Sequence, residues 1–204
     1  MPCSASRSEP PHGAPAGRML GPLLLALLLL SGPVGAAGAS SAKPGFEVLD
    51  ATTHSHQGQR LADVRIAFRF SPQAREALEN GVAISVFVDL EVVSLGYLWD
   101  TTIATRHTGR RIQIHALSKQ YQVKNLYTGR SSTYRSFSDM TANIGIIKNL
   151  PLIEEAHLQA DGHYRLRVRA SLDIESLPSP LRPLAYISAA WQLSSDWTSW
   201  PLQP

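Results

Sequence analysis

Apolar and polar residues alternate along most of the chain after about residue 46. Long alternating stripes run from Val82 to Val92 and over 163–175, and shorter ones cover 61–70 and 112–116. Because side chains along a strand point to opposite faces in turn, each segment is predicted to be a strand with one buried and one solvated face. Burial on one face is typical of antiparallel sheets. The pattern therefore predicts a mainly β fold, either an antiparallel β-sandwich or a curved sheet.

Three short polar segments that contain glycine are predicted to separate these strands. Gly58 follows an early strand at about 46–54, Gly109 lies between two extended runs, and Gly162 precedes the strand at 163–175. Glycine adopts the positive φ that tight hairpins require. We therefore expect a turn at each of the three glycines.

Two short helices are predicted at the edges of the sheet. Ser71 followed by Pro72 is a helix start signal, and Gly81 is the matching stop signal. A second helix is expected over about 138–149, with its end set by Pro151.

The C-terminal part, from Leu177 onward, is rich in proline and tryptophan. Its prolines cannot donate ladder hydrogen bonds, so this part is predicted to be an extended strap laid across the domain. Trp191, Trp197 and Trp200 are expected to stack on sugars, to line an apolar groove, or to clamp the strap onto the core.

The N-terminal segment has the three parts of a secretory signal peptide. Arg7 and Arg18 precede an unbroken apolar run at 23–30, and small residues follow. The run is far shorter than the roughly 20 residues that a membrane-spanning helix needs. Residues 1–39 are therefore predicted to be a signal peptide, with an uncleaved membrane anchor as the alternative.

The domain boundaries follow from this segment. Small-x-small patterns predict cleavage after Ala36 or Ala39, which leaves 40–45 as a linker and 46–204 as a single β-rich domain. The expected location is the periplasm, and the only membrane contact expected is the transient one of the signal peptide.

Composition and charge exclude several classes of protein. With 204 residues there is room for one domain, and 44% hydrophobic against 17% charged residues excludes a disordered chain. The single cysteine, Cys3, excludes an intramolecular disulfide framework. A scattered net charge of +3 does not indicate nucleic-acid binding. Motifs of hydrolases, zinc proteases and nucleotide-binding loops are absent, so neither an enzyme nor a cofactor is predicted.

A row of basic residues is the first candidate for a binding surface. Arg165, Arg167 and Arg169 share one face of a predicted strand. They suit an anionic partner such as lipid head groups, a phosphorylated glycan or an acidic protein. The alternative is structural, because Asp89 and Glu91 on another strand have the same spacing and are able to form cross-strand ion pairs.

His54 and His56 are a weak candidate for a metal site. Two histidines at positions i and i+2 share a strand face, and Asp50 lies on the same face. A metal site needs a third ligand, which the sequence does not indicate, and the two histidines lie next to a polar turn. No metal is therefore predicted.

Tyrosines lie among basic residues in the middle of the chain. Tyr121, Tyr127 and Tyr134 lie between Lys119 and Arg135. This spacing predicts a mixed aromatic and basic surface, which also occurs in nucleic-acid binders. An exported protein meets little nucleic acid, so such a partner is not expected.

Four segments resemble a known family. They are Leu98-Trp99-Asp100, the run from His115 to Tyr121, the run from Leu177 to Pro183, and the closing run from Trp191 to Trp200. Together they resemble the proteobacterial domain of unknown function 4390, over about 46–200. The resemblance implies an exported protein in a signalling context beside a membrane sensor histidine kinase. It implies no catalytic residues.

We therefore expect a periplasmic, non-enzymatic binding or accessory protein, associated with a membrane sensor kinase or another envelope protein. An envelope carrier that binds lipid, glycan or metal in a cleft of the sheet is the alternative, and an enzyme with a dispersed site stays open. The residues expected to bind the partner are Arg165, Arg167, Arg169, Tyr121, Trp99, Trp197 and Trp200.

Overall fold

The computed structural model of the chain describes residues 43–202. The predicted signal peptide over 1–39 and its cleavage sites at Ala36 and Ala39 lie outside the described residues. The described part belongs to one compact unit, Ser41–Pro204.

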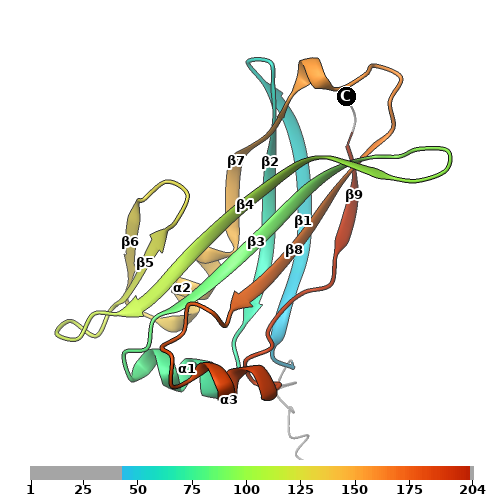
Figure 1. Cartoon of the computed structure of the whole chain (residues 1–204). Coiled ribbons are helices and arrows are strands. Elements are labelled where there is room, and N and C mark those ends of the chain that lie inside the picture. Colours follow the sequence, from blue (N-terminus) through green and yellow to red (C-terminus); the bar gives the residue numbers. More distant parts are fainter. Residues whose placement is uncertain (1–42, 203–204) are drawn as a thin grey trace, which may run out of the picture. The chain divides into compact units, whose positions relative to one another are not determined.

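Two antiparallel sheets form this unit, which confirms the predicted mainly β, sandwich-like fold (Figure 1). The smaller sheet has the order β1-β2-β7, with β1 at Gly45–His56, β2 at Gln59–Arg69 and β7 at Ile146–Glu154. The larger sheet has the order β6-β5-β4-β3-β8-β9, with β6 at Ser131–Tyr134, β5 at Tyr121–Asn125, β4 at Thr101–Ile114, β3 at Ile84–Ser94, β8 at Tyr164–Asp173 and β9 at Thr198–Leu202.

The core lies between the two sheets and follows the period-two pattern of the sequence. Strand β3 buries every second side chain from Ile84 to Val92, and β2 buries every second one from Ala62 to Phe68. These side chains belong to one continuous hydrophobic cluster. Fully burying an aliphatic side chain of this size contributes about 1.5–3 kcal/mol, so the cluster is the main source of stability.

Helix α1 (Pro72–Glu79) begins and ends where the sequence predicts. The Ser71 hydroxyl accepts a hydrogen bond from the Ala74 amide at 3.1 Å, and Gly81 follows the helix with φ of 87°. Ala74 and Leu78 are fully buried and hold the helix on the core.

Helix α2 (Phe137–Ile144) is shorter than predicted. It ends at Gly145, where a Cβ atom would lie 2.0 Å from the Ile66 carbonyl oxygen, so the chain passes directly against β2. The next residues form β7, and the predicted stop signal Pro151 lies inside that strand. Strand β7 is at the edge of its sheet, where a missing N–H donor is tolerated.

Of the three glycine turns, the one at Gly58 is confirmed, with φ of 75°. Gly109 is not in a turn but inside β4, opposite Phe87, and a Cβ there would lie 2.5 Å from the Phe87 ring. Gly162 follows a turn but lacks a positive φ, and a Cβ there would lie against the Tyr164 ring. At these two positions glycine makes room for an aromatic ring.

The C-terminal part is more regular than an extended strap. It contains a third short helix, α3 (Arg182–Ile187), and the edge strand β9, whereas two helices were predicted. Between them, the amides of Leu172 and Ser195 donate to Leu193 and Ala170 at 2.8 Å, which ties this segment to β8. The Phe46 amide donates to the Ser194 carbonyl at 3.4 Å, so the same segment also contacts β1. It therefore closes one side of the sandwich.

A one-turn 3-10 helix, η1 (Glu155–His157), follows β7. Within residues 43–202, no helix has the length and apolarity that crossing a membrane would require.

Candidate functional site

The predicted row of arginines lies on the outer face of the larger sheet, and two of its members are paired with acids. Arg169 lies opposite Asp89 and Arg167 opposite Glu91 across the β3–β8 ladder. The side-chain distances are 3.2 Å for the first pair and 3.5 Å for the second. His107 on β4 also contacts Asp89, at 2.5 Å. These are the cross-strand ion pairs of the structural alternative.

Trp197 covers the same two arginines. Its ring centre lies 4.9 Å from the Arg167 guanidinium carbon and 4.8 Å from that of Arg169. At these distances the indole and the guanidinium groups form cation–π contacts. The charges of Arg167 and Arg169 are thus engaged on two sides, by carboxylates and by an aromatic ring.

Arg165 differs from its two neighbours. Its partners in the sheet are Val93 and Pro201 rather than acids, and among the described residues it makes no ion pair. It lines a pocket of about 570 Å³ together with Trp200 and Leu95. Trp200 packs partly on the core, whereas Trp191 is buried in it.

Trp99, another predicted partner-binding residue, is not near the arginines of β8. It lies on the loop between β3 and β4. This loop projects from the end of the two long strands (Figure 1). Trp99 is 71% exposed, and Tyr97 and Leu98 beside it are exposed as well. The structure therefore separates Trp99 from Arg167, Arg169 and Trp197.

Tyr121 does not lie on the surface, contrary to the prediction. It is 7% exposed, faces the core from β5, and its ring packs edge-on against Phe137 at 5.8 Å. Burial raises the pKa of the Tyr121 hydroxyl. Tyr127 is exposed and Tyr134 is half-buried, so the three tyrosines do not form one surface.

The two candidate metal ligands are not joined by a third. His54 Nε2 lies 3.1 Å from the Asn149 side-chain oxygen, and Asp50 pairs with Arg65 at 3.3 Å. In the part of the chain that the structure describes, no three His, Cys, Asp or Glu side chains are grouped so as to hold a metal ion.

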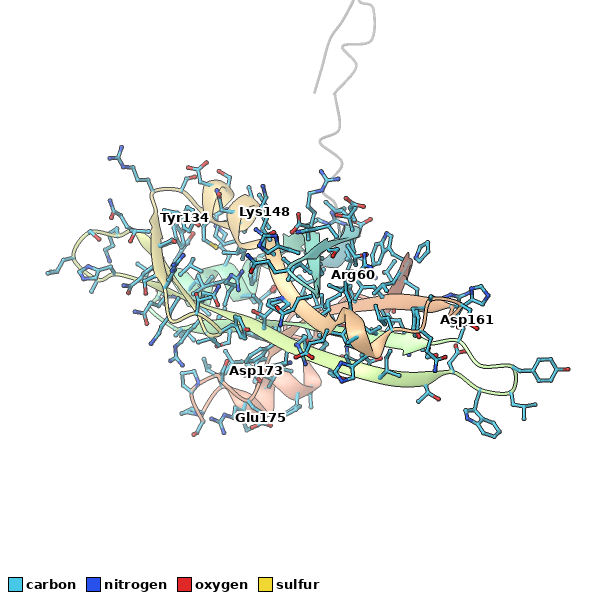
Figure 2. All side chains as sticks on the ribbon, turned by 90° about the horizontal axis from the view of Figure 1, so that it is seen from above. Arg60, Tyr134, Lys148, Asp161, Asp173 and Glu175 are labelled. Carbon is cyan, nitrogen blue, oxygen red and sulfur yellow. The ribbon has the colours of Figure 1, made fainter. Side chains whose placement is uncertain are left out.

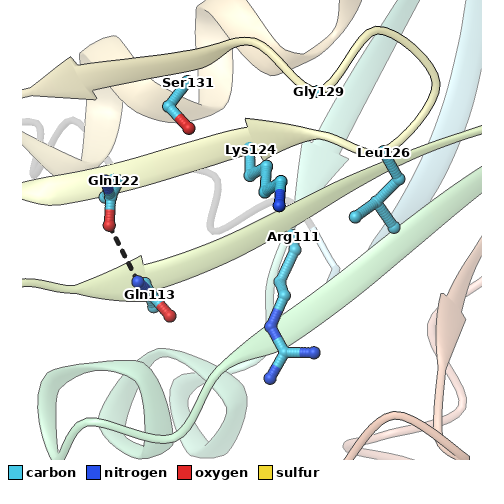
Figure 3. A pocket seen from close by; sticks show the side chains of 7 residues that line it. All are labelled: Arg111, Gln113, Gln122, Lys124, Leu126, Gly129 and Ser131. Carbon is cyan, nitrogen blue, oxygen red and sulfur yellow. Dashed lines mark hydrogen bonds between the residues drawn. The ribbon is translucent and has the colours of Figure 1, made fainter.

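A pocket of about 620 Å³ lies on the outer face of β4, β5 and the β5–β6 loop (Figure 3). Alternate residues of β4 and β5 point outward and supply a cation and an amide from each strand. Gln113 donates to Gln122 at 2.8 Å across the two strands. We call the outer face of these strands around the pocket the basic surface; the pocket is lined by Arg111, Gln113, Gln122, Lys124, Leu126, Gly129 and Ser131.

A second pocket, of about 610 Å³, adjoins the first. Arg111 and Gln113 line both, and the second extends along the segment after α1 to Arg182. Arg182 pairs with Glu175 at 3.6 Å. Figure 2 shows Glu175 and Asp173 on the side of the molecule away from Tyr134. Arg111 and Lys124, in contrast, form no ion pair with any described residue.

The basic surface has a sequence signal that the motif analysis missed. From Thr101 to Ser138 the chain holds seven Lys and Arg residues and no Asp or Glu. The remaining residues of 43–202 hold ten basic and fifteen acidic residues. A small net charge thus hides a strong separation of charge along the chain.

Arg110, next to Arg111, faces the opposite way. It is half-buried on the inner side of β4, and its guanidinium donates to Thr108 Oγ1 at 3.4 Å and to the Gly109 carbonyl at 3.3 Å. Burial lowers the pKa of Arg110. Of the two neighbouring arginines, only Arg111 therefore presents its charge to the pocket.

Comparison with known proteins identifies a family but no characterised relative. No curated protein and no solved structure matches the chain. A family model, described as a domain of unknown function (DUF4390), matches residues 43–201, which include every strand and helix described above except the last residue of β9. The chain therefore belongs to the DUF4390 family.

Proposed function

We propose that this protein is an exported, non-enzymatic binding protein whose basic surface binds an acidic partner. The observation that carries the proposal is the pocket in which Arg111 and Lys124 meet no carboxylate among the described residues. Unpaired cations in a concave surface attract anionic groups and speed their association. The acid-free segment from Thr101 to Ser138 extends this positive field beyond the pocket.

The amides in the pocket supply directional contacts. Gln113 and Gln122 have both donors and acceptors, and Ser131 adds a hydroxyl. Charge attracts a partner over a distance, whereas such hydrogen-bonding groups select among anionic partners once they are in contact. The combination suits a folded acidic surface with its own polar groups.

The family resemblance supplies the class of partner. It implies an envelope protein in the context of a membrane sensor histidine kinase, so the partner we propose is an acidic face of such a sensor domain. The proposal includes no catalytic step. The described lining of the pocket contains no histidine, carboxylate or cysteine that would serve Ser131 as a base or act as a nucleophile.

Charge reversal in the native host tests this function. A photo-crosslinker at Gln122, inside the pocket, is expected to join the chain to an acidic envelope protein. Arg111→Glu with Lys124→Glu should reduce that crosslink by about tenfold, since both cations contact the partner.

Lys43→Glu with Lys148→Glu is the matched control, because it changes the net charge equally and both residues lie outside the basic surface. If the control reduces the crosslink as strongly as the pocket variant, net charge rather than this surface guides binding and the proposal is wrong.

The pocket volume favours one second candidate, an envelope carrier of a small anionic ligand. About 620 Å³ is within the range of small-molecule sites, and paired amides beside cations suit an acidic sugar. Native mass spectrometry of protein from its host separates the two functions. A co-purified acidic glycan that is lost in Arg111→Glu would support the carrier, and an empty chain would favour the protein partner.

A further inference from the structure

The loop between β3 and β4 presents three large side chains to solvent. Tyr97 is fully exposed, Leu98 is 74% exposed and Trp99 is 71% exposed. Figure 2 shows the hairpin that carries them reaching beyond Asp161, which marks the same end of the domain. Adjacent apolar side chains that lack cover in a folded domain commonly mark a contact site.

The hairpin around these side chains is suited to an apolar medium. From Val92 to Thr105 the only charged residue is Asp100. The β3–β4 ladder continues to the pair of Ser94 and Thr101, so backbone pairing reaches the base of the loop 95–100 that carries the three side chains. Backbone groups that are paired within the protein cost less to remove from water, so the strands beside this loop tolerate the boundary of a bilayer.

A pocket at the base of the hairpin combines an apolar lining with one arginine. The Leu95 amide donates to the His163 carbonyl at 2.9 Å, which joins the loop to the start of β8. Leu95, Trp200 and Pro201 supply apolar lining to the pocket of about 570 Å³, and His163 and Arg165 also line it. Arg165 makes no ion pair with the described residues. An unpaired guanidinium beside apolar lining matches a phosphate attached to acyl chains.

We infer that this end of the domain docks on an anionic phospholipid surface, with Tyr97, Leu98 and Trp99 in the interface and Arg165 on the headgroup phosphates. Tyrosine and tryptophan favour the membrane–water boundary. A projecting tip also needs no complementary shape in a bilayer, whereas a protein interface of ordinary size needs a broad, flat contact area. This inference concerns a different surface from the proposed function and stands without it.

Vesicle binding tests the inference on the segment Ser41–Pro204. Among the described residues the core runs from Phe46 to Leu202 and lies within one compact unit, Ser41–Pro204, and this segment lacks the apolar N-terminal run. Partition is measured on phosphatidylcholine vesicles and on equimolar phosphatidylcholine and phosphatidylglycerol vesicles. The natural sequence should bind both, and the anionic vesicles more tightly.

Two variants separate the tip from the arginine. Tyr97→Ser with Trp99→Ser should lower partition at least about tenfold on both vesicles, because two aromatic side chains leave the interface. Arg165→Gln should remove most of the preference for the anionic vesicles and leave binding to phosphatidylcholine unchanged. Thermal melts confirm that each variant is folded.

The control residues for the tip lie on other loops, Leu117 between β4 and β5 and Tyr127 between β5 and β6. Leu117→Ser with Tyr127→Ser removes two exposed side chains of similar size, one of them 91% exposed, and should leave partition unchanged. Arg111→Glu with Lys124→Glu should leave binding to phosphatidylcholine unchanged. The inference is overturned if the segment does not bind vesicles, or if the tip and control variants lose partition equally. It is also overturned if a photo-crosslinker at position 99 joins the chain to a protein while vesicle binding is absent.

Discussion

Two rows of cations on the outer face of the same sheet behave differently. On β8, Arg167 and Arg169 lie opposite Glu91 and Asp89 and under Trp197. On β4 and β5, Arg111 and Lys124 lie side by side, partners in the ladder, with no acid in register. The free charge of a strand face is therefore set by the residues in register on the neighbouring strand, and the number of cations does not determine it.

The largest expected effect comes from the residue between the two regions, Gly109. Gly109→Val should lower the free energy of unfolding by about 2 kcal/mol, because the added side chain meets the Phe87 ring, which stacks on His107. Urea unfolding measures the change. Thr105→Val, on the same strand and exposed, is the control and should shift the midpoint little. An equal shift in both would show that the ring is not the cause.

Removing an acid should convert the paired region into one that resembles the basic surface. Asp89→Asn leaves Arg169 and His107 without their carboxylate. We expect a loss of about 1 kcal/mol in stability, because both pairs are partly exposed, together with stronger salt-sensitive retention on an anionic resin. Asp63→Asn, on the other sheet, should not produce this increase. If Asp89→Asn leaves retention on the anionic resin unchanged, the acids in register on the neighbouring strand do not determine how much cationic charge is free.

Neutralising one arginine in each region should show the difference between paired and unpaired cations through smaller changes in stability. Arg167→Gln removes an ion pair and a cation–π contact and should cost about 0.5–1 kcal/mol. Arg111→Gln removes neither and should change stability by less than about 0.5 kcal/mol. Chemical unfolding at low and high salt measures both. Equal costs would mean that the contacts of Arg167 contribute nothing beyond those of an exposed side chain.

The smallest expected effect is a difference in alkaline stability between a buried and an exposed tyrosine of the acid-free segment from Thr101 to Ser138. Because burial raises the pKa of Tyr121, its neutral form is favoured in the folded state, and its contribution is complete below the unfolded pKa of about 10. As the pH rises through the higher folded pKa, that contribution is lost. Tyr121→Phe should therefore flatten the decline of stability at alkaline pH, and Tyr127→Phe should not. Thermal melts across this pH range decide between them.

The sequence predicted the elements that carry regular patterns. Strands β3 and β8 have one apolar face throughout, and Ser71, Pro72 and Gly81 frame α1 with defined local interactions. Strands β6 and β7 were not predicted, because their sequences lack this regular pattern. Three of the four residues of β6 are Ser or Thr on both faces, and β7 contains Pro151, so neither alternates clearly.

The candidate site was predictable only in part. The ion pairs of Arg167 and Arg169 could be anticipated because Asp89 and Glu91 have the same period of two. Burial of Tyr121 also had a signal, since Tyr121 and Val123 alternate with polar neighbours in β5. The partners of Arg165 could not be anticipated, because they depend on which residues of β9 pair with β8.

The length of β4 has a consequence for how the protein would work at a membrane. Arg111 lies ten positions after Thr101, which is next to the hairpin tip, and at roughly 3.3 Å per residue this part of β4 spans about 33 Å. With the tip resting on a bilayer and the strand upright, the pocket stands at that height above the lipid head groups. This is several times the screening distance of about 8 Å in physiological salt, so an acidic partner would be met well outside the field of the membrane. If both proposals hold, the length of β4 would set the height above the bilayer at which the acidic partner is contacted.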